Sequence, residues 1–260
     1  MELNGFIYEK SHGVGRVRFN RSESRNALDL SMREELQWII SDLKKDLDIR
    51  VVAISAEGKS FCAGGDIKTM GGKEGMISGK ERVMRICNMI HDLAYLEKPV
   101  IAAVNGAATG AGLSIVLCCD LVIASDSARF GAPFTRIGLV PDTGTTYFLP
   151  RVVGLAKARE MIMTGDLIDA EEALRVGLIT RIVPHELLEE EFEKVVSSFS
   201  TRAYKALGMA KINMLRGLDT DLRSANMFET YSNAMLFHSE DHKEGINAFI
   251  DKREPVFVGK

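Results

Sequence analysis

The hydrophobic positions of the chain follow two different spacings, and their order along the sequence predicts an α/β core. Three short runs are almost wholly apolar, as in strands buried on both faces of a parallel sheet, and they span residues 51–55, 99–104 and 120–125. Between them, apolar side chains recur every three or four positions, which predicts helices near residues 31–46, 81–96 and 110–118. The repeated order of strand, loop, helix and strand favours parallel pairing with right-handed crossovers, although a doubly wound sheet has the same order.

The N-terminal residues predict a β-hairpin and the cap of the first helix. Two segments, 6–8 and 14–19, flank a turn at residues 11–13. Ser31 precedes Glu34 by three positions, which is the spacing of a capping box, so the first helix is expected to begin there.

The last third of the chain predicts mostly helix. Asp169 and Glu172 have the spacing that caps a short helix, and nearly all residues after His185 continue a helical pattern. A boundary near residue 198 divides the chain into an α/β core over 1–198 and a helical region over 199–260. The methionines of this tail are more typical of core or subunit packing than of a cofactor site.

The composition excludes several classes of protein. The 260 residues have a net charge of −3 and form no basic cluster of the kind that binds nucleic acid. No apolar run approaches the roughly 20 residues that cross a bilayer, and the first residues lack the features of a signal peptide. The four cysteines match neither a zinc site nor a redox pair, so reduced thiols in a cytoplasmic protein are expected.

Two glycine-rich turns are the first candidates for chemistry. Gly65 lies in a loop, residues 61–67, that follows a predicted buried strand, and Ala111 lies at the start of a predicted helix after the turn at residues 106–112. Backbone N–H groups at such places are able to stabilise a developing oxyanion, and the helix N-terminus adds its dipole. Each turn alone is more often an ordinary strand-to-helix connection.

Asp142 is the candidate proton carrier. It lies in the run 137–144, about thirty residues after the second glycine turn, beside the apolar residues Phe134, Ile137 and Leu139. Desolvation by such neighbours raises the pKa of a carboxyl group toward working pH and improves it as a base. The alternative is that Asp142 caps a helix over 143–149, because aspartate is a favoured N-cap residue.

The two turns together resemble the crotonase superfamily, the enoyl-CoA hydratase/isomerase family. The motifs that carry the resemblance are FCAGGDI at residues 61–67, KPVIAAVNGAATGAG at 98–112 and SEDHKEGINAF at 239–249, and they extend over essentially the whole chain. The resemblance implies an α/β spiral of repeated β-β-α units with a C-terminal helical trimerisation region. It also implies a homotrimer or a dimer of trimers that takes an acyl-CoA thioester as substrate, with no cofactor.

The resemblance further assigns roles to individual residues. It implies that the amides of Gly65 and Ala111 form the oxyanion hole. Met70 and Tyr147 are expected to shape the pocket for the acyl chain. The residues expected to contact CoA are Arg25, Ala27, Ala63, Asp66 and Ile67, with Phe249 and Lys252 reaching the CoA of a neighbouring subunit.

Two departures from the family pattern narrow the chemistry. Hydratases of the family use two glutamates, whereas motif alignment puts Ser114 and Phe134 at those two positions. Both residues are expected to line the pocket. A serine hydroxyl has no useful basicity near neutral pH and a phenylalanine ring has none, so concerted water addition loses both expected proton carriers. The run around Asp142 resembles the single-acid branches, such as the ring-epoxide isomerases of phenylacetate breakdown and peroxisomal-type enoyl-CoA isomerases.

The sequence therefore predicts an enoyl-CoA isomerase that works through a thioester enolate. Two alternatives remain open: a hydratase that uses Asp142 with an unrecognised partner, and a non-catalytic acyl-CoA-binding protein. A metal site is not expected, because His238 and His242 have a helical spacing but no further ligand pattern.

Overall fold

The protein is described by a computed structural model that covers residues 2–69 and 75–260, and a six-stranded sheet forms its centre. The strand order is β1-β2-β3-β5-β7-β10, and every neighbouring pair except β1–β2 is parallel. The expected hairpin and parallel core are therefore confirmed. The strands are β1 (Phe6–Ser11), β2 (Val14–Phe19), β3 (Val51–Ala56), β5 (Val100–Val104), β7 (Leu121–Ser125) and β10 (Arg181–Val183).

A second sheet of four short strands lies beside the first, and the hydrophobic pattern did not predict its strands. Its order is β4-β6-β8-β9. Three of its strands each follow a strand of the large sheet, so the chain repeats a β-β-α unit, and the expected α/β class with this unit is confirmed. The strands are β4 (Ser60–Cys62), β6 (Ala107–Thr109), β8 (Arg129–Gly131) and β9 (Ile168–Asp169).

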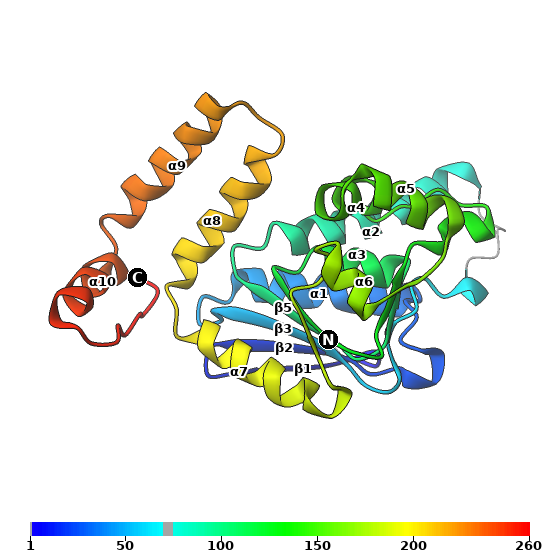
Figure 1. Ribbon diagram of the computed structural model, residues 1–260, viewed down its shortest axis with the longest axis horizontal. Coiled ribbons are helices and arrows are strands. Elements are labelled where there is room, and N and C mark those ends of the chain that lie inside the picture. The colour runs from blue at the N-terminus through cyan, green and yellow to red at the C-terminus, as the bar shows by residue number, and fades with distance from the viewer. Residues whose placement is uncertain (1, 70–74) are drawn as a thin grey trace.

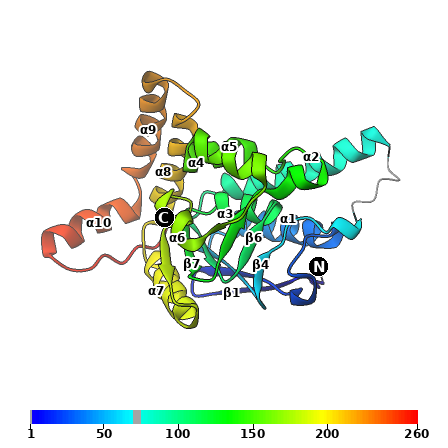
Figure 2. The same cartoon turned by 45° about the vertical axis from the view of Figure 1, so that its right-hand side comes forward.

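Both faces of the large sheet are buried, which explains its continuous apolar runs. Along β3, Val52 and Ile54 enter the core shared with α1, α2 and α3, whereas Val51 and Ala53 enter a smaller core against α7. The helices that contribute to these two cores appear in Figures 1 and 2. They are α1 (Leu30–Lys45), α2 (Met76–Ala94), α3 (Ala111–Leu117), α4 (Thr145–Val153), α5 (Leu155–Thr164), α6 (Ala170–Arg175) and α7 (Leu188–Ser200), with short 3-10 turns η1 (Ser22–Ser24), η2 (Ile67–Thr69), η3 (Pro133–Ile137) and η4 (His185–Leu187).

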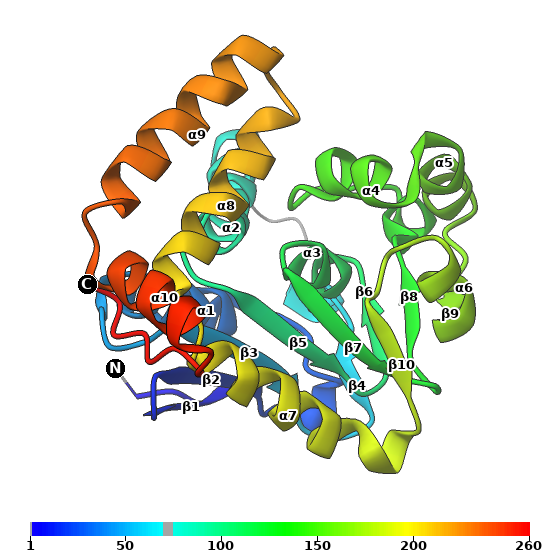
Figure 3. The same cartoon turned by 60° about the vertical axis from the view of Figure 1, so that its left-hand side comes forward.

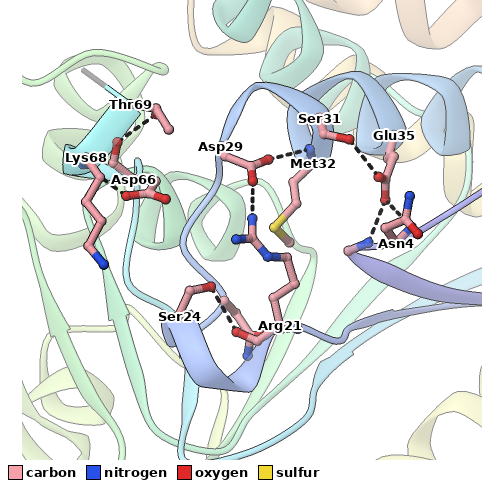
Figure 4. Close-up of polar contacts among 12 residues, drawn as sticks. Asn4, Arg21, Ser24, Asp29, Ser31, Met32, Glu35, Asp66, Lys68 and Thr69 are labelled. Carbon is pink, nitrogen blue, oxygen red and sulfur yellow. Dashed lines mark hydrogen bonds and ion pairs between the residues drawn. The ribbon is translucent and has the colours of Figure 1, made fainter. Parts of the chain in front are cut away.

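The cap of α1 differs from the predicted one. Asp29, not Ser31, is the N-cap residue, and its carboxylate accepts a hydrogen bond of 2.9 Å from the Met32 amide and pairs with Arg21 (Figure 4). Ser31 instead donates to Glu35, a buried carboxylate that also accepts from the Gly5 amide. The predicted capping box was wrong because Asp29 and Ser31 are both residues that cap helices, and the helix begins at Leu30, directly after Asp29, whose carboxylate accepts the Met32 amide. The Asp169 cap of α6 is confirmed by its bond from the Glu172 amide.

Three further helices extend away from the sheets (Figures 1 and 3): α8 (Tyr204–Gly217), α9 (Leu222–Leu236) and α10 (Glu240–Asp251). The C-terminal residues fold back onto α10, because the buried carboxylate of Asp241 accepts the amides of Val258 and Gly259. Within residues 2–69 and 75–260, no helix is long and apolar enough to cross a membrane. The division at residue 198 stays a prediction, as does a subunit interface on these helices.

Candidate active site

A cavity of about 490 Å³ brings together the central residues of the predicted site. Its walls come from the loop after β4 and the start of η2, the start of α3, η3 with the loop that follows it, the middle of α2, and one residue of α1. This size suits a small-molecule ligand, for which pockets of roughly 300–1,000 Å³ are usual. The predicted residues that line the cavity are Ala63, Gly65, Ile67, Ala111, Phe134 and Asp142.

The two glycine-rich turns pack directly against each other. Thr109 Oγ1 donates a hydrogen bond of 3.0 Å to the carbonyl of Ala63, which joins the end of β6 to the loop after β4. A Cβ on Gly112 would stand 2.2 Å from the carbonyl oxygen of Cys62, so only glycine permits this approach. Gly64 has φ +93°, a conformation that side chains with a Cβ rarely adopt. The glycines of both motifs thus allow the two turns to pack against each other.

The amides of Gly65 and Ala111 are left unused by the surrounding backbone. The strand-like bridge between Leu28 and Gly65 is made by the flanking peptide groups, with Leu28 donating to Gly64 and Asp66 donating to Leu28. Ala111 is the first residue of α3, where an N–H has no partner within the helix. Among the described residues, neither amide donates to a protein acceptor, and both residues line the cavity. Two such donors suit a developing oxyanion.

Asp142 faces the same cavity and does not cap a helix. Helix α4 begins at Thr145, its N-cap is Gly144, and no side chain makes the capping bond. The capping interpretation was wrong because Gly144, with φ +76°, intervenes. The Thr145 amide donates to the backbone carbonyl of Asp142 and not to its side chain. Burial raises the pKa of the Asp142 carboxyl, and this outweighs the lowering by a hydrogen bond from Thr143 and by the charge of Arg33.

A cluster of three buried hydroxyl groups lies behind Asp142. Ser114 Oγ is 2.6 Å from Thr143 Oγ1 and 2.8 Å from Thr145 Oγ1, and all three side chains are buried. Thr143 has φ +52°, which is unusual for a β-branched residue, and the bond to Ser114 helps to hold it there. Ser114 therefore lies behind the cavity wall and not in the cavity, while Phe134 lies in it.

The predicted CoA loops are laid side by side by backbone hydrogen bonds. The Ala63 amide donates to the Arg25 carbonyl at 3.0 Å. Asn26 anchors the first loop, because its fully buried side chain donates to the carbonyls of Glu57 and Ser60. Arg25, Ala27 and Asp66 thus lie next to the cavity-lining residues. Asp66 is drawn in Figure 4, where its carboxylate accepts from the Lys68 amide. Their role toward CoA stays a prediction.

Other predicted site residues lie elsewhere. The hydroxyl of Tyr147 on α4 hydrogen-bonds Asp219, and the residue is not part of the cavity wall. Phe249, 87% exposed, and Lys252 belong to α10 and its end, at the opposite end of the molecule from α2 (Figures 1 and 2). Within one chain they are remote from the cavity, and contact with a neighbouring subunit's CoA stays a prediction. Met70 lies outside the described residues.

Several residues of the cavity wall were not predicted from the sequence, and Arg33 is one of them. Arg33, on the first turn of α1, contributes its side chain to the cavity wall. Nothing in the sequence singles it out, because arginine is common on exposed helix faces. Among the described residues, no group of three or more His, Cys, Asp or Glu side chains is arranged to hold a metal ion.

Comparison with known proteins agrees with this geometry. The family model described as enoyl-CoA hydratase/isomerase matches residues 9–260. A short-chain-enoyl-CoA hydratase of Clostridium acetobutylicum is 38% identical over 98% of this chain and 97% of its own length. A crotonyl-CoA hydratase of Syntrophomonas wolfei is 33% identical over the full length of both chains. The crystal structure of an enoyl-CoA hydratase from Bacillus anthracis superposes with a TM-score of 0.93 at 33% identity, covering 99% of this chain and 100% of that one.

Proposed function

Because the chain belongs to the enoyl-CoA hydratase/isomerase family, we propose that it moves a C=C bond of an enoyl-CoA thioester through an enolate, with Asp142 as the proton carrier. The observation that supports this proposal is the composition of the cavity wall. Among the described residues that line it, Asp142 is the one carboxylate, and it shares the cavity with the unused amides of Gly65 and Ala111. One carboxylate is sufficient for a proton shuttle.

The steps of the proposed reaction balance on these groups alone. The Asp142 carboxylate removes a proton from C2 of a 3-enoyl-CoA, and the C–H electron pair moves into a dienolate whose negative charge lies on the thioester oxygen. The amides of Gly65 and Ala111 hold that oxygen; one such donor typically contributes about 10²–10³-fold to kcat. The protonated Asp142 then returns its proton to C4, and the double bond ends between C2 and C3.

The environment of Asp142 suits this role. A carboxylate with its ordinary pKa is too weak a base to remove a carbon-bound proton efficiently near neutral pH. Burial raises the pKa of Asp142, which brings it closer to the working pH. The Phe134 ring, beside Gly110 in the same cavity, helps to keep water away.

Hydration is the second candidate, and the names of the relatives favour it over isomerisation. The relatives from C. acetobutylicum and S. wolfei and the B. anthracis structure are all named hydratases. In that reaction Asp142 would take a proton from water as the oxygen adds to C3, and an unrecognised second group would give a proton to C2. The cavity residues weigh against it, because no second carboxylate from the described part of the chain lines the wall.

Two assays with the purified protein separate these candidates. We expect 3-hexenoyl-CoA to be converted to its conjugated 2-isomer faster than crotonyl-CoA is hydrated. Fast hydration without isomerisation would replace the isomerase proposal with the hydratase one. NMR in deuterated water adds the third outcome: tight binding of thioesters with no exchange of their C2 protons identifies a non-catalytic acyl-CoA-binding protein.

We also propose that the helices α8–α10 form the interface of a homotrimer or a dimer of trimers. Three large apolar side chains are exposed in this region: Tyr231 on α9, Phe237 just after it and Phe249 on α10. Large exposed apolar patches mark contacts with other chains. Sedimentation velocity of the wild type and of Tyr231→Asp tests this. A monomeric wild type contradicts it, whereas dissociation caused by the substitution supports it.

A further inference from the structure

Arg33 is a cation in the candidate active site that the proposed reaction does not use. Its side chain lines the cavity that holds Asp142, and it also lines a second cavity of about 540 Å³ between α1 and α2. Arg82 and Ile86 of α2 are shared by both walls in the same way. The site therefore continues past Asp142 toward the groove between these two helices, and Arg33 stands where the two spaces meet.

The guanidinium of Arg33 has no partner among residues 2–69 and 75–260. Its Nε is shut off from solvent and makes no hydrogen bond, and the nearby carboxylate of Asp29 is paired with Arg21 instead. The other arginines of the cavity wall differ in this respect. Arg136 is held by Asp166 and by the Thr164 carbonyl, and Arg82 is engaged as well.

A half-buried guanidinium without a partner is unfavourable in the free protein. It has lost part of its hydration, and it remains charged because arginine does not deprotonate in proteins. Burial lowers the pKa of Arg33, and the nearby charge of Asp142 offsets only part of that lowering. An anionic group bound from solution would supply the missing partner, preferably a planar carboxylate that accepts two N–H bonds.

We propose that Arg33 binds a carboxylate at the far end of the acyl chain, so that the substrates are CoA thioesters of dicarboxylic acids. This inference rests on the proposed function for one point only, namely that the thioester lies at Gly65 and Ala111. The acyl chain then extends past Asp142, and Arg33 is the cation on that side of the cavity whose hydrogen-bonding capacity is unused. Arg33 and Asp142 line the same cavity, so the two groups belong to one site.

Calorimetric binding of two saturated thioesters tests the proposal without any turnover. The pair is hexanoyl-CoA and the mono-CoA thioester of hexanedioic acid, which have the same chain length and differ in the terminal carboxylate. We expect the wild type to prefer the diacid thioester, and Arg33→Met to reduce that preference about 10- to 100-fold, as for loss of charge-assisted hydrogen bonds. Arg33→Lys should retain part of it. Arg159→Met, on the exposed surface of α5 and in neither cavity, should retain all of it.

Three results would overturn the proposal. The first is equal affinity of the wild type for both thioesters. The second is a loss of affinity for free CoA in Arg33→Met as large as the loss for the diacid thioester, which would assign the guanidinium to the CoA phosphates. The third is an altered pH profile in that variant with an unchanged diacid preference, which would mean that Arg33 only lowers the pKa of Asp142 and does not bind the substrate. Since binding needs no catalysis, a diacid preference would stand even if the protein failed to isomerise any thioester.

Discussion

The candidate active site has two halves that are built in different ways. One half is backbone: the amides of Gly65 and Ala111, set by two turns that Gly64 and Gly112 allow to touch. The other half is side chain: Asp142 and Phe134 in the cavity, with Ser114 behind the wall. The backbone half matches the family motifs residue by residue, whereas the side-chain half departs from them at two of three positions.

This difference separates what the family shares from what one member does. Holding an oxyanion with main-chain amides depends on the path of the chain and survives changes of neighbouring side chains. Moving a proton depends on which side chains reach the substrate, and single substitutions alter that. The reaction of this protein therefore has to be inferred from the side-chain half, even though the backbone half identifies the family.

Asp142→Asn should give the largest effect, because it removes the proposed proton carrier and leaves both amides in place. General acid–base groups typically contribute about 10²–10⁴-fold, so kcat for 3-hexenoyl-CoA is expected to fall by that order. Affinity for a saturated acyl-CoA should change little, since asparagine has nearly the same shape. Stopped assays of isomerisation and calorimetry of hexanoyl-CoA measure the two quantities. Unchanged turnover would refute Asp142 as the base.

Gly112→Ala should disturb the backbone half instead. The added Cβ would lie 2.2 Å from the Cys62 carbonyl oxygen, so the two turns must move apart and the amides lose their spacing. We expect kcat to drop about 10²–10³-fold, as for loss of one oxyanion donor, together with a lower melting temperature.

The matched control for that change is Gly79→Ala on α2, where a Cβ would meet nothing within 4 Å. It should keep wild-type activity and raise stability slightly, by up to about 1 kcal/mol, because alanine favours the helix. Circular dichroism melts and isomerisation rates of both variants make the comparison. Equal activity of the two variants would show that the contact between the turns does not determine the positions of the Gly65 and Ala111 amides.

The elements that could be predicted from the sequence are those whose burial leaves a long pattern. The runs at β3 and β5 are apolar because alternate residues enter two different cores, so their existence and parallel pairing could be inferred. The second sheet escaped prediction because its strands are two or three residues long and show no period. The helix caps were ambiguous wherever two suitable residues lay close together, as with Asp29 and Ser31.

The site residues also divide into those that could be predicted from the sequence and those that could not. The resemblance anticipated that Gly65, Ala111 and Asp142 lie in one cavity, although their roles still await the experiments above. The position of Ser114 could not be anticipated, because it depends on Thr143 adopting a left-handed conformation. Arg33 could not be found either, since a lack of hydrogen-bond partners is a property of the folded neighbourhood and leaves no mark in the sequence.

Ser114→Ala should have a smaller effect than the changes to either half, and mainly on stability. It leaves the buried hydroxyls of Thr143 and Thr145 without their shared partner, at a cost of about 1–3 kcal/mol. Denaturant unfolding measures this loss, with Ser198→Ala on the exposed side of α7 as the neutral control. Turnover should fall only severalfold. A loss as large as that of Asp142→Asn would mean that Ser114 acts directly on the substrate.

The smallest expected effect is a shift of the acid limb of the pH profile. The base must be ionised, so kcat/KM should fall as the pH drops through the pKa of Asp142, which burial raises above the usual 3.8. Arg33→Met removes a charge that lowers this pKa, and the limb should move to higher pH. Phe134→Ala admits water to the cavity, weakens the desolvation and should move the limb to lower pH. Shifts of the same sign in both variants would show that the limb belongs to another group.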